Sequence, residues 1–206
     1  MLSVVFTLAT LGFDISYYQG AVSQDTFNCL ANNGYTLAII QAQMGSTFNN
    51  NAISDYLKAK VAGIQQVDFY IYPTTSKDAR SQVSDTIHRL VDEGVMDGMV
   101  WLDVESPDLF FDYWYTNQWF IATILDEMSN ILGANRVGVY SSKKTWISIV
   151  GEEWDDASAH QLWYPRYDNQ LNFDDFKNFG GWNVPSMKQY QGDQSECGTA
   201  LNRNFY

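Results

Sequence analysis

Residues 99–106, MVWLDVES, place two carboxylates at the end of an apolar run. Four apolar residues lead into Asp103, Val104 separates it from Glu105, and Pro107 then interrupts the pattern. An apolar run that ends before a proline-bearing turn is typical of a buried strand reaching its carboxyl end. Side chains two residues apart share one face of a strand, with anchor points roughly 6.5 Å apart. The two carboxylates are therefore expected to face the same place.

This spacing of the two carboxylates is compatible with acid–base catalysis but also with other functions. Burying like charges so close forces their pKa values apart, which leaves one proton-holding acid beside one ionised partner. Glycosidic bond cleavage needs such a pair. The same carboxylates could instead bind a hard cation, or lie in solvent at a strand end. The D-x-E pattern alone leaves these three interpretations open.

Length and charge narrow the class of protein. The chain has 206 residues, of which 46% are hydrophobic and 17% charged, so a single globular domain is expected. Its 12 basic and 24 acidic residues give a formal net charge of −12 at pH 7. Nucleic acid and anionic membrane surfaces bind basic patches, so neither is an expected partner.

The N-terminus carries an uncharged apolar run, LSVVFTLATL at positions 2–11. This run has the length of a signal-peptide core and is too short to span a bilayer, although no Lys or Arg precedes it. We expect a signal peptide over residues 1–12, cleaved before Phe13, and one domain over residues 13–206. The expected location is outside the cell or in a lysosomal or phagosomal lumen. Alternatively, the run forms the first buried strand of the mature protein.

Two cysteines, Cys29 and Cys197, stand far apart in the chain and outside any C-x-x-C motif. In an exported protein they would pair and tie the last segment to the first helix, whereas in a cytosolic protein they would be buried thiols. Neither His88 nor His160 has ligand partners at motif spacing, so no metal site is expected.

Apolar strands and amphipathic helices alternate along the first 150 residues, and a glycine follows most of the helices. Strands are predicted at residues 12–16, 36–43, 67–72, 99–105 and 136–140. Helices are predicted to begin near Ser23, after the Asn-rich 47–51, at Ser76 or Asp78, at Thr116 or Asn117, and at Ser141. Only strands are predicted beyond Gly151, at 162–164, 188–190 and 201–206. This order predicts an α/β fold, either a TIM-like barrel with five β-α units and a β closing third, or an open doubly wound sheet.

Functional groups of a barrel collect where its strands end. One further acid, two amides and several aromatic rings fall on the predicted strands with the D-x-E pair: Asp14, Gln41, Gln43, Tyr70, Tyr72, Tyr140, Trp163 and Tyr164. Aromatic rings stack on the apolar faces of sugars, and amides bond their hydroxyls. Any single aromatic residue is more often part of a core, so only the set indicates a sugar site.

Six stretches together resemble glycoside hydrolase family 25: GFDISYYQG at 12–20, WLDVE at 101–105, VGVYSS at 137–142, LWYPRYD at 162–168, QYQGD at 189–193 and CGTALNRNFY at 197–206. These are the muramidase-type lysozymes, which cut the bond between N-acetylmuramic acid and N-acetylglucosamine in bacterial peptidoglycan. The resemblance covers nearly the whole chain. It implies an irregular (β/α)5β3 barrel without a metal or organic cofactor. The paired cysteines are similar to those of the eukaryotic, exported members.

The resemblance also implies a role for each acid. Glu105 would be the general acid, with a pKa raised by burial and by neighbouring acids. Asp103 would stay ionised, and would either stabilise positive charge or orient the N-acetyl group of the substrate as an internal nucleophile. Asp14 would be a third acid that holds the sugar. Retention and inversion both stay open.

Two positions depart from the family pattern. Its last strand usually carries Asp in a D-x-N pattern, and here Asn202 stands in that place. Asn202 is expected to bind substrate hydroxyls, and the lost charge would lower the pKa of Glu105 by about one unit. Gln41 stands where a basic residue usually ends the second strand, so the anionic lactyl or peptide group lacks that cation.

The predicted function is therefore a lysozyme that acts in defence or feeding on bacterial cell wall, as a monomer. A non-catalytic protein on the same barrel that binds peptidoglycan or chitin is the rival from another class. A glycosidase for chitin-like polymers would suit the uncharged Gln41. A metal-dependent hydrolase is the weakest alternative, because no histidine has ligand spacing.

Overall fold

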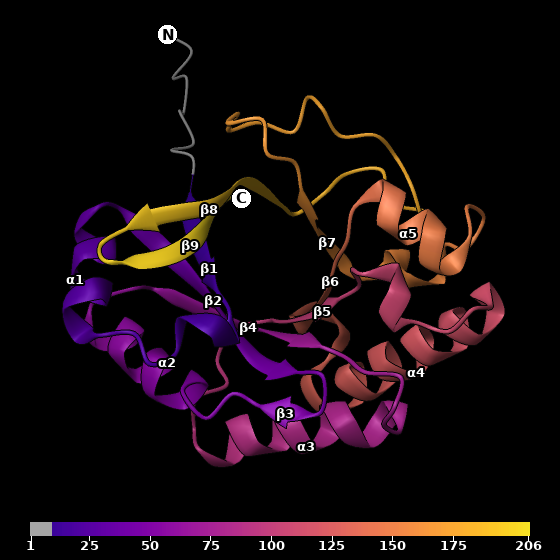
Figure 1. The fold of residues 1–206 in the computed structure, drawn as a ribbon, viewed down its shortest axis with the longest axis horizontal. Helices are drawn as coiled ribbons and strands as arrows, with labels where there is room; N and C mark the ends of the chain where they lie inside the picture. The colour runs from indigo at the N-terminus through magenta and orange to yellow at the C-terminus, as the bar shows by residue number, and fades with distance from the viewer. Residues whose placement is uncertain (1–9) are drawn as a thin grey trace, which may run out of the picture.

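Parallel strands joined by helices form the first two thirds of the molecule. The computed structural model describes residues 10–206 and is drawn in Figure 1. Its strands are β1 (Leu11–Ile15), β2 (Tyr35–Met44), β3 (Thr47–Phe48), β4 (Gln66–Tyr72), β5 (Val100–Asp103), β6 (Val137–Tyr140), β7 (Gln161–Pro165), β8 (Met187–Glu196) and β9 (Thr199–Phe205). Its α-helices are α1 (Gln24–Asn32), α2 (Ala52–Val61), α3 (Ala79–Asp92), α4 (Trp114–Leu132) and α5 (Lys143–Val150).

Strand pairing closes the sheet into a barrel. Strand β1 pairs with β2 on one side and with β9 on the other, in the order β1-β9-β8-β7-β6-β5-β4-β2, and β3 only extends β2. Strands β1, β2, β4, β5, β6, β7 and β8 pair in parallel, each with the next in this order. Two antiparallel pairs, β8 with β9 and β9 with β1, close the ring. The predicted barrel of five β-α units and three closing strands is confirmed, and the open doubly wound sheet is wrong.

The barrel has separate inner and outer cores. The helices lie around the outside of the strands, while β8 and β9 complete the ring (Figure 1). Inside it, one apolar cluster consists of Leu37, Ile39, Tyr70, Trp101, Tyr140, Trp163 and Met187. Gly138 leaves room for this filling, because a Cβ there would collide with the ring of Trp101. Because the interior is packed, a ligand can reach the strands only at their ends.

Polar caps begin several helices. The hydroxyl of Ser23 accepts from the backbone N–H of Thr26 at 3.1 Å, and Asp78 accepts from those of Arg80 and Ser81. Both starts were among those predicted.

Two predicted helix starts are wrong. Helix α5 is capped by Ser142, because the hydroxyl of Ser141 instead donates to Val104 O at 2.7 Å. Helix α4 begins at Trp114, without a side-chain cap. The Asn117 side chain holds the preceding loop by two bonds to the backbone of Phe111, each of 2.9 Å.

A disulfide joins Cys29 on α1 to Cys197, between β8 and β9, across 168 residues of sequence. The predicted pairing is confirmed. The predicted signal peptide lies mostly outside the described residues. Leu11 and Gly12 belong to β1, where they pair with Phe205 and Asn204 of β9. Within residues 10–206, no helix has both the length and the apolar character needed to cross a membrane.

Candidate active site

Asp14 lies on β1 at the carboxyl end of the barrel, where it accepts three hydrogen bonds from amides. Asn202 Nδ2 donates to its Oδ1, and Gln189 Nε2 and Asn204 Nδ2 donate to its Oδ2, each at 2.8 Å. Strand register brings them together, because Asp14 pairs directly with Asn202 on β9. Burial raises the pKa of Asp14, and the three amide donors oppose that rise because they stabilise the ionised form.

Two of these three amides are themselves held by aromatic side chains. Gln189 Oε1 accepts from Tyr140 OH at 2.9 Å and from Tyr167 OH at 2.7 Å. Asn204 Oδ1 accepts from Trp163 Nε1 at 2.9 Å. The sequence analysis did not identify Gln189, Asn204 and Tyr167 as residues of the site. The available signal was the amides at alternate positions of the two closing strands, which place them on the inner face.

Asp103 is the last residue of β5 and is buried inside the mouth of the barrel. No described protein group donates a hydrogen bond to its Oδ1. Burial, and then the charges of Glu105 and Asp14, raise the pKa of Asp103 well above its usual range. The surroundings of Asp103 therefore favour its protonated form, whereas the sequence analysis expects the ionised form. A buried carboxyl beside two other acids keeps its proton more readily.

Glu105 lies beyond the strand rather than on it. Strand β5 ends at Asp103, after which Val104 N donates to Tyr140 O at 2.8 Å and Ser106 turns the chain at a φ of 56°. Val104 packs into the outer core, so Glu105 returns to the side of Asp103 and is exposed at the mouth. Partial desolvation, and then the charge of Asp14, raise the pKa of Glu105. This direction is the one that a general acid requires.

Four of the predicted sugar-binding positions surround these acids. The rings of Tyr70 and Tyr140 pack against Trp163, with centroids 6.4 Å and 4.5 Å from it. Burial, and then the charges of acids that include Asp103 and Glu105, raise the pKa values of Tyr70 and Tyr140 well above their usual range. Tyr72 is half-buried, and its pKa is raised by burial and then by the same two acids.

Three other predicted positions serve the framework. Gln41 is buried, and its Oε1 accepts from the backbone N–H of Tyr17 at 2.8 Å, which fixes the loop after β1. Gln43 faces α3, where its side chain bonds Thr86. Tyr164 faces away from the barrel interior, and its hydroxyl donates to Asp175 Oδ1 at 3.0 Å. The structure does not bring Gln43 and Tyr164 to the carboxylates.

Carboxylates clustered at the ends of barrel strands, among aromatic rings, are typical of glycoside hydrolases built on an α/β barrel. The family model described as Lysozyme-like protein 1 matches residues 8–190. Probable GH family 25 lysozyme 5 of Dictyostelium discoideum is 34% identical over 210 residues, which span 99% of this chain and 94% of that protein. The chain therefore belongs to the glycoside hydrolase family 25 lysozymes.

Solved structures share the fold. A family GH25 lysozyme from Aspergillus fumigatus superposes with a TM-score of 0.74 at 18% identity, covering 97% of this chain and 94% of that one. The bacterial lysozyme from Streptomyces coelicolor also gives 0.74, at 17% identity over 96% and 92% of the two chains. Within residues 10–206, no group of three or more His, Cys, Asp or Glu side chains is arranged to hold a metal ion.

Proposed function

We propose that this protein hydrolyses the β-1,4 bond between N-acetylmuramic acid and N-acetylglucosamine in bacterial peptidoglycan. The observation that carries the proposal is Glu105, an accessible carboxyl with a raised pKa next to two buried acids at the barrel mouth. Membership of the protein in this family and the half-buried ring of Tyr72 beside these acids support a polysaccharide substrate. Export, with residues 1–12 as signal peptide, and a monomeric state belong to the same proposal; the disulfide supports export.

Each acid has a distinct role in the proposed reaction. Glu105 donates its proton to the glycosidic oxygen as the bond to that oxygen breaks, and later accepts a proton from the attacking water. Asp14, whose ionised form accepts three amide hydrogen bonds, offsets positive charge that develops on the sugar ring. Asp103 Oδ1 is left free by the described protein groups, so it is placed to accept from the N–H of the N-acetyl group.

The direct test is release of reducing ends by the wild-type protein between pH 4 and pH 7. We expect turnover of purified peptidoglycan and much slower turnover of soluble chitin oligomers. Turnover of chitin oligomers alone would support the chitin-type glycosidase instead. Because Glu105 must hold its proton, activity should fall as the pH rises through its raised pKa.

The alternative is a binding protein on the same barrel, favoured by the amide of Asn202 in place of the usual acid. Sedimentation with insoluble peptidoglycan distinguishes the two. Binding without any release of reducing ends, at every pH tested, would establish the binding protein and exclude the enzyme.

Substitution of Asn202 by Asp tests how neighbouring charge tunes the acid. Asn202 donates to Asp14 at 2.8 Å, so two carboxylates would meet there and share a proton at low pH. Above the pKa at which that proton leaves, the added charge raises the pKa of Glu105. The alkaline limb of the kcat/KM profile should therefore move upward, by up to about one pH unit. Asn202→Ala adds no charge, so an equal upward shift in that control would contradict the explanation.

A further inference from the structure

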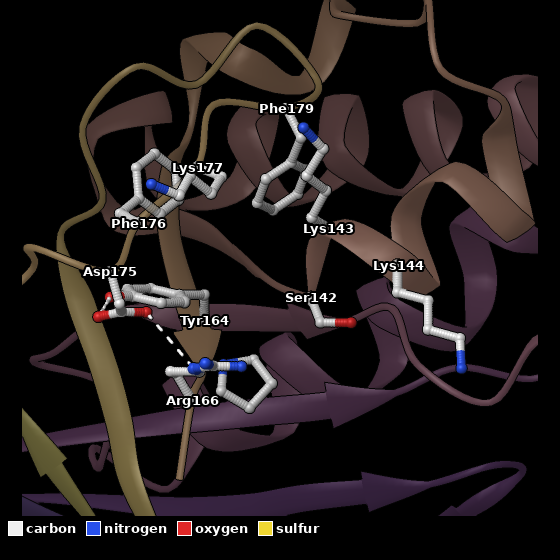
Figure 2. A pocket seen from close by; sticks show the side chains of 10 residues that line it. Ser142, Lys143, Lys144, Tyr164, Arg166, Asp175, Phe176, Lys177 and Phe179 are labelled. Atoms are coloured by element: carbon white, nitrogen blue, oxygen red, sulfur yellow. Dashed lines mark hydrogen bonds and ion pairs between the residues drawn. The ribbon is translucent and has the colours of Figure 1, made fainter. Parts of the chain in front are cut away.

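A pocket of about 350 Å³ lies on the rim of the barrel, between the start of α5 and the β7–β8 loop. Figure 2 shows the side chains of α5, β7 and the loop that line it. It is lined by Ser142, Lys143, Lys144, Tyr164, Pro165, Arg166, Asp175, Phe176, Lys177 and Phe179. Nothing in the proposed cleavage chemistry uses this pocket.

Its charge is opposite to that of the whole protein. The chain has only 12 basic residues against 24 acidic ones, yet four of the basic residues line this pocket: Lys143, Lys144, Arg166 and Lys177. All four are exposed. The pocket's single carboxylate, Asp175, already accepts from buried Lys188 at 2.6 Å and from Tyr164 at 3.0 Å. Arg166 also lies 3.9 Å from Asp175, but the other three cations still leave a surplus of positive charge that would attract an anionic ligand.

The pocket also offers an apolar wall. Tyr164 and Phe176 pack with ring centroids 5.2 Å apart, and Phe176 and Phe179 with centroids 6.0 Å apart. A small inorganic anion would leave these rings without a partner. A ligand with both carboxylates and aliphatic carbon, such as a short acidic peptide, matches the charges and the wall together.

Backbone connections place the pocket next to the acids. Arg166 N donates to Gln189 O at 2.9 Å, and the side chain of the same Gln189 donates to Asp14 at 2.8 Å. On the other side, Ser142 follows Tyr140 by two residues, and Tyr140 OH also bonds Gln189. A group attached to a sugar bound at the acids could therefore reach this rim.

We propose that this pocket binds the carboxylates of the peptide that is linked to the muramic acid of the glycan. The inference rests on the proposed function and adds a specificity to it: preference for glycan that carries peptide. It also accounts for the neutral Gln41, because the positive charge that an anionic substrate needs lies on the opposite side of the mouth.

The test compares native peptidoglycan with the same material after its carboxyl groups are converted to amides, which keeps every glycosidic bond. The variant is Lys144→Gln/Arg166→Gln/Lys177→Gln. We expect kcat/KM on native peptidoglycan to fall about tenfold, as three exposed charge pairs are lost, and kcat/KM on the amidated polymer to stay within about twofold. Arg80→Gln/Arg89→Gln, two exposed cations on α3, controls for net charge and should match the wild type.

Equal losses on the two polymers, or no loss on either, would overturn the pocket's role. Glycan strands stripped of peptide by an amidase keep a lactyl carboxylate. In native peptidoglycan the lactyl carboxyl is held in the amide bond to the peptide. If the variant is as impaired on the stripped strands as on native peptidoglycan, the pocket accepts any carboxylate near the muramic acid and the preference for peptide is wrong. Sedimentation of wild type and variant with native and amidated polymer tests the pocket without turnover. A wild type that binds in a carboxylate-dependent way but never hydrolyses would reject the enzyme and keep the pocket.

Discussion

Glu105→Gln is expected to lower kcat for peptidoglycan hydrolysis by about 10³-fold, while binding of the polymer changes little. Gln has nearly the shape of Glu but carries no transferable proton, so the leaving oxygen would depart unprotonated. Because Glu105 is exposed at the mouth, the substitution should not disturb the fold. Release of reducing ends at the optimal pH, together with sedimentation of the polymer, measures the two effects separately.

A matched control removes one exposed carboxylate without touching the site. Asp112→Asn, in the loop before α4, makes the same chemical change and should retain wild-type activity. Should Glu105→Gln keep more than about a tenth of the activity, the proton would come from elsewhere. Asp103, whose pKa is raised further by burial, would then become the candidate acid.

The balance of protons between these acids also predicts a pH effect for this variant. Part of the rise in the pKa of Asp103 comes from the charge of Glu105, after burial. A neutral Gln removes that charge, so Asp103 should lose its proton at lower pH than in the wild type. Titration of the carboxyl resonances by NMR would show this shift, and an unchanged Asp103 would mean that the two acids are not coupled.

Periodicity made the barrel predictable. Buried strands that alternate with helices of 3.6-residue period appear directly in the amino-acid pattern, because one set of side chains must face the core. Strand β8 is longer than its predicted core of residues 188–190, since its second half is a polar hairpin with β9 that has two register shifts. Polar side chains with irregular register carry no clear hydrophobic pattern.

Side-chain direction limited the prediction of the site. Gln41 and Gln43 should share a face of β2, but a register shift falls between them, and Gln43 turns toward α3. Adjacent Trp163 and Tyr164 must face opposite ways on a strand, so only one of them could reach the acids. The amides that hold Asp14 come from β8 and β9, nearly the whole chain away in sequence. Only closure of the barrel brings them together.

The β7–β8 loop, which carries Tyr167 and half of the rim pocket, is anchored by one buried cation. Lys188 is fully buried on β8, and its Nζ donates to Asp168 at 2.8 Å, to Asp175 at 2.6 Å and to Asn172 O at 3.1 Å. Both carboxylates are mostly covered, with side-chain exposures of 24% and 20%. Two acids held so close without their shared cation would repel one another and lack hydrogen-bond donors.

Lys188→Met is therefore expected to lower the free energy of unfolding by about 3 kcal/mol at pH 7, measured by urea denaturation. The loss should shrink in acid. Desolvation acts to raise the pKa of Asp168, but hydrogen bonds, of which the one from Lys188 has the largest effect, bring that pKa below its usual value. A lowered carboxyl pKa stabilises the fold above its unfolded pKa of about 3.9, and that stabilisation disappears as the pH falls through the folded pKa.

A compensating variant separates lost charge balance from lost packing. Lys188→Met/Asp168→Asn/Asp175→Asn removes all three charges, so most of the stability should return, as it does when buried ion pairs are replaced by neutral groups. If this triple variant stays as unstable as Lys188→Met, the lysine acts through packing of its stem rather than through its charge. If neither variant loses more than about 1 kcal/mol, the loop is held mainly by its aromatic contacts. Charge balance as the cause also requires that the single variant weaken the rim pocket. Asp175 already lies 3.9 Å from Arg166, and without Lys188 its full charge would act on that cation.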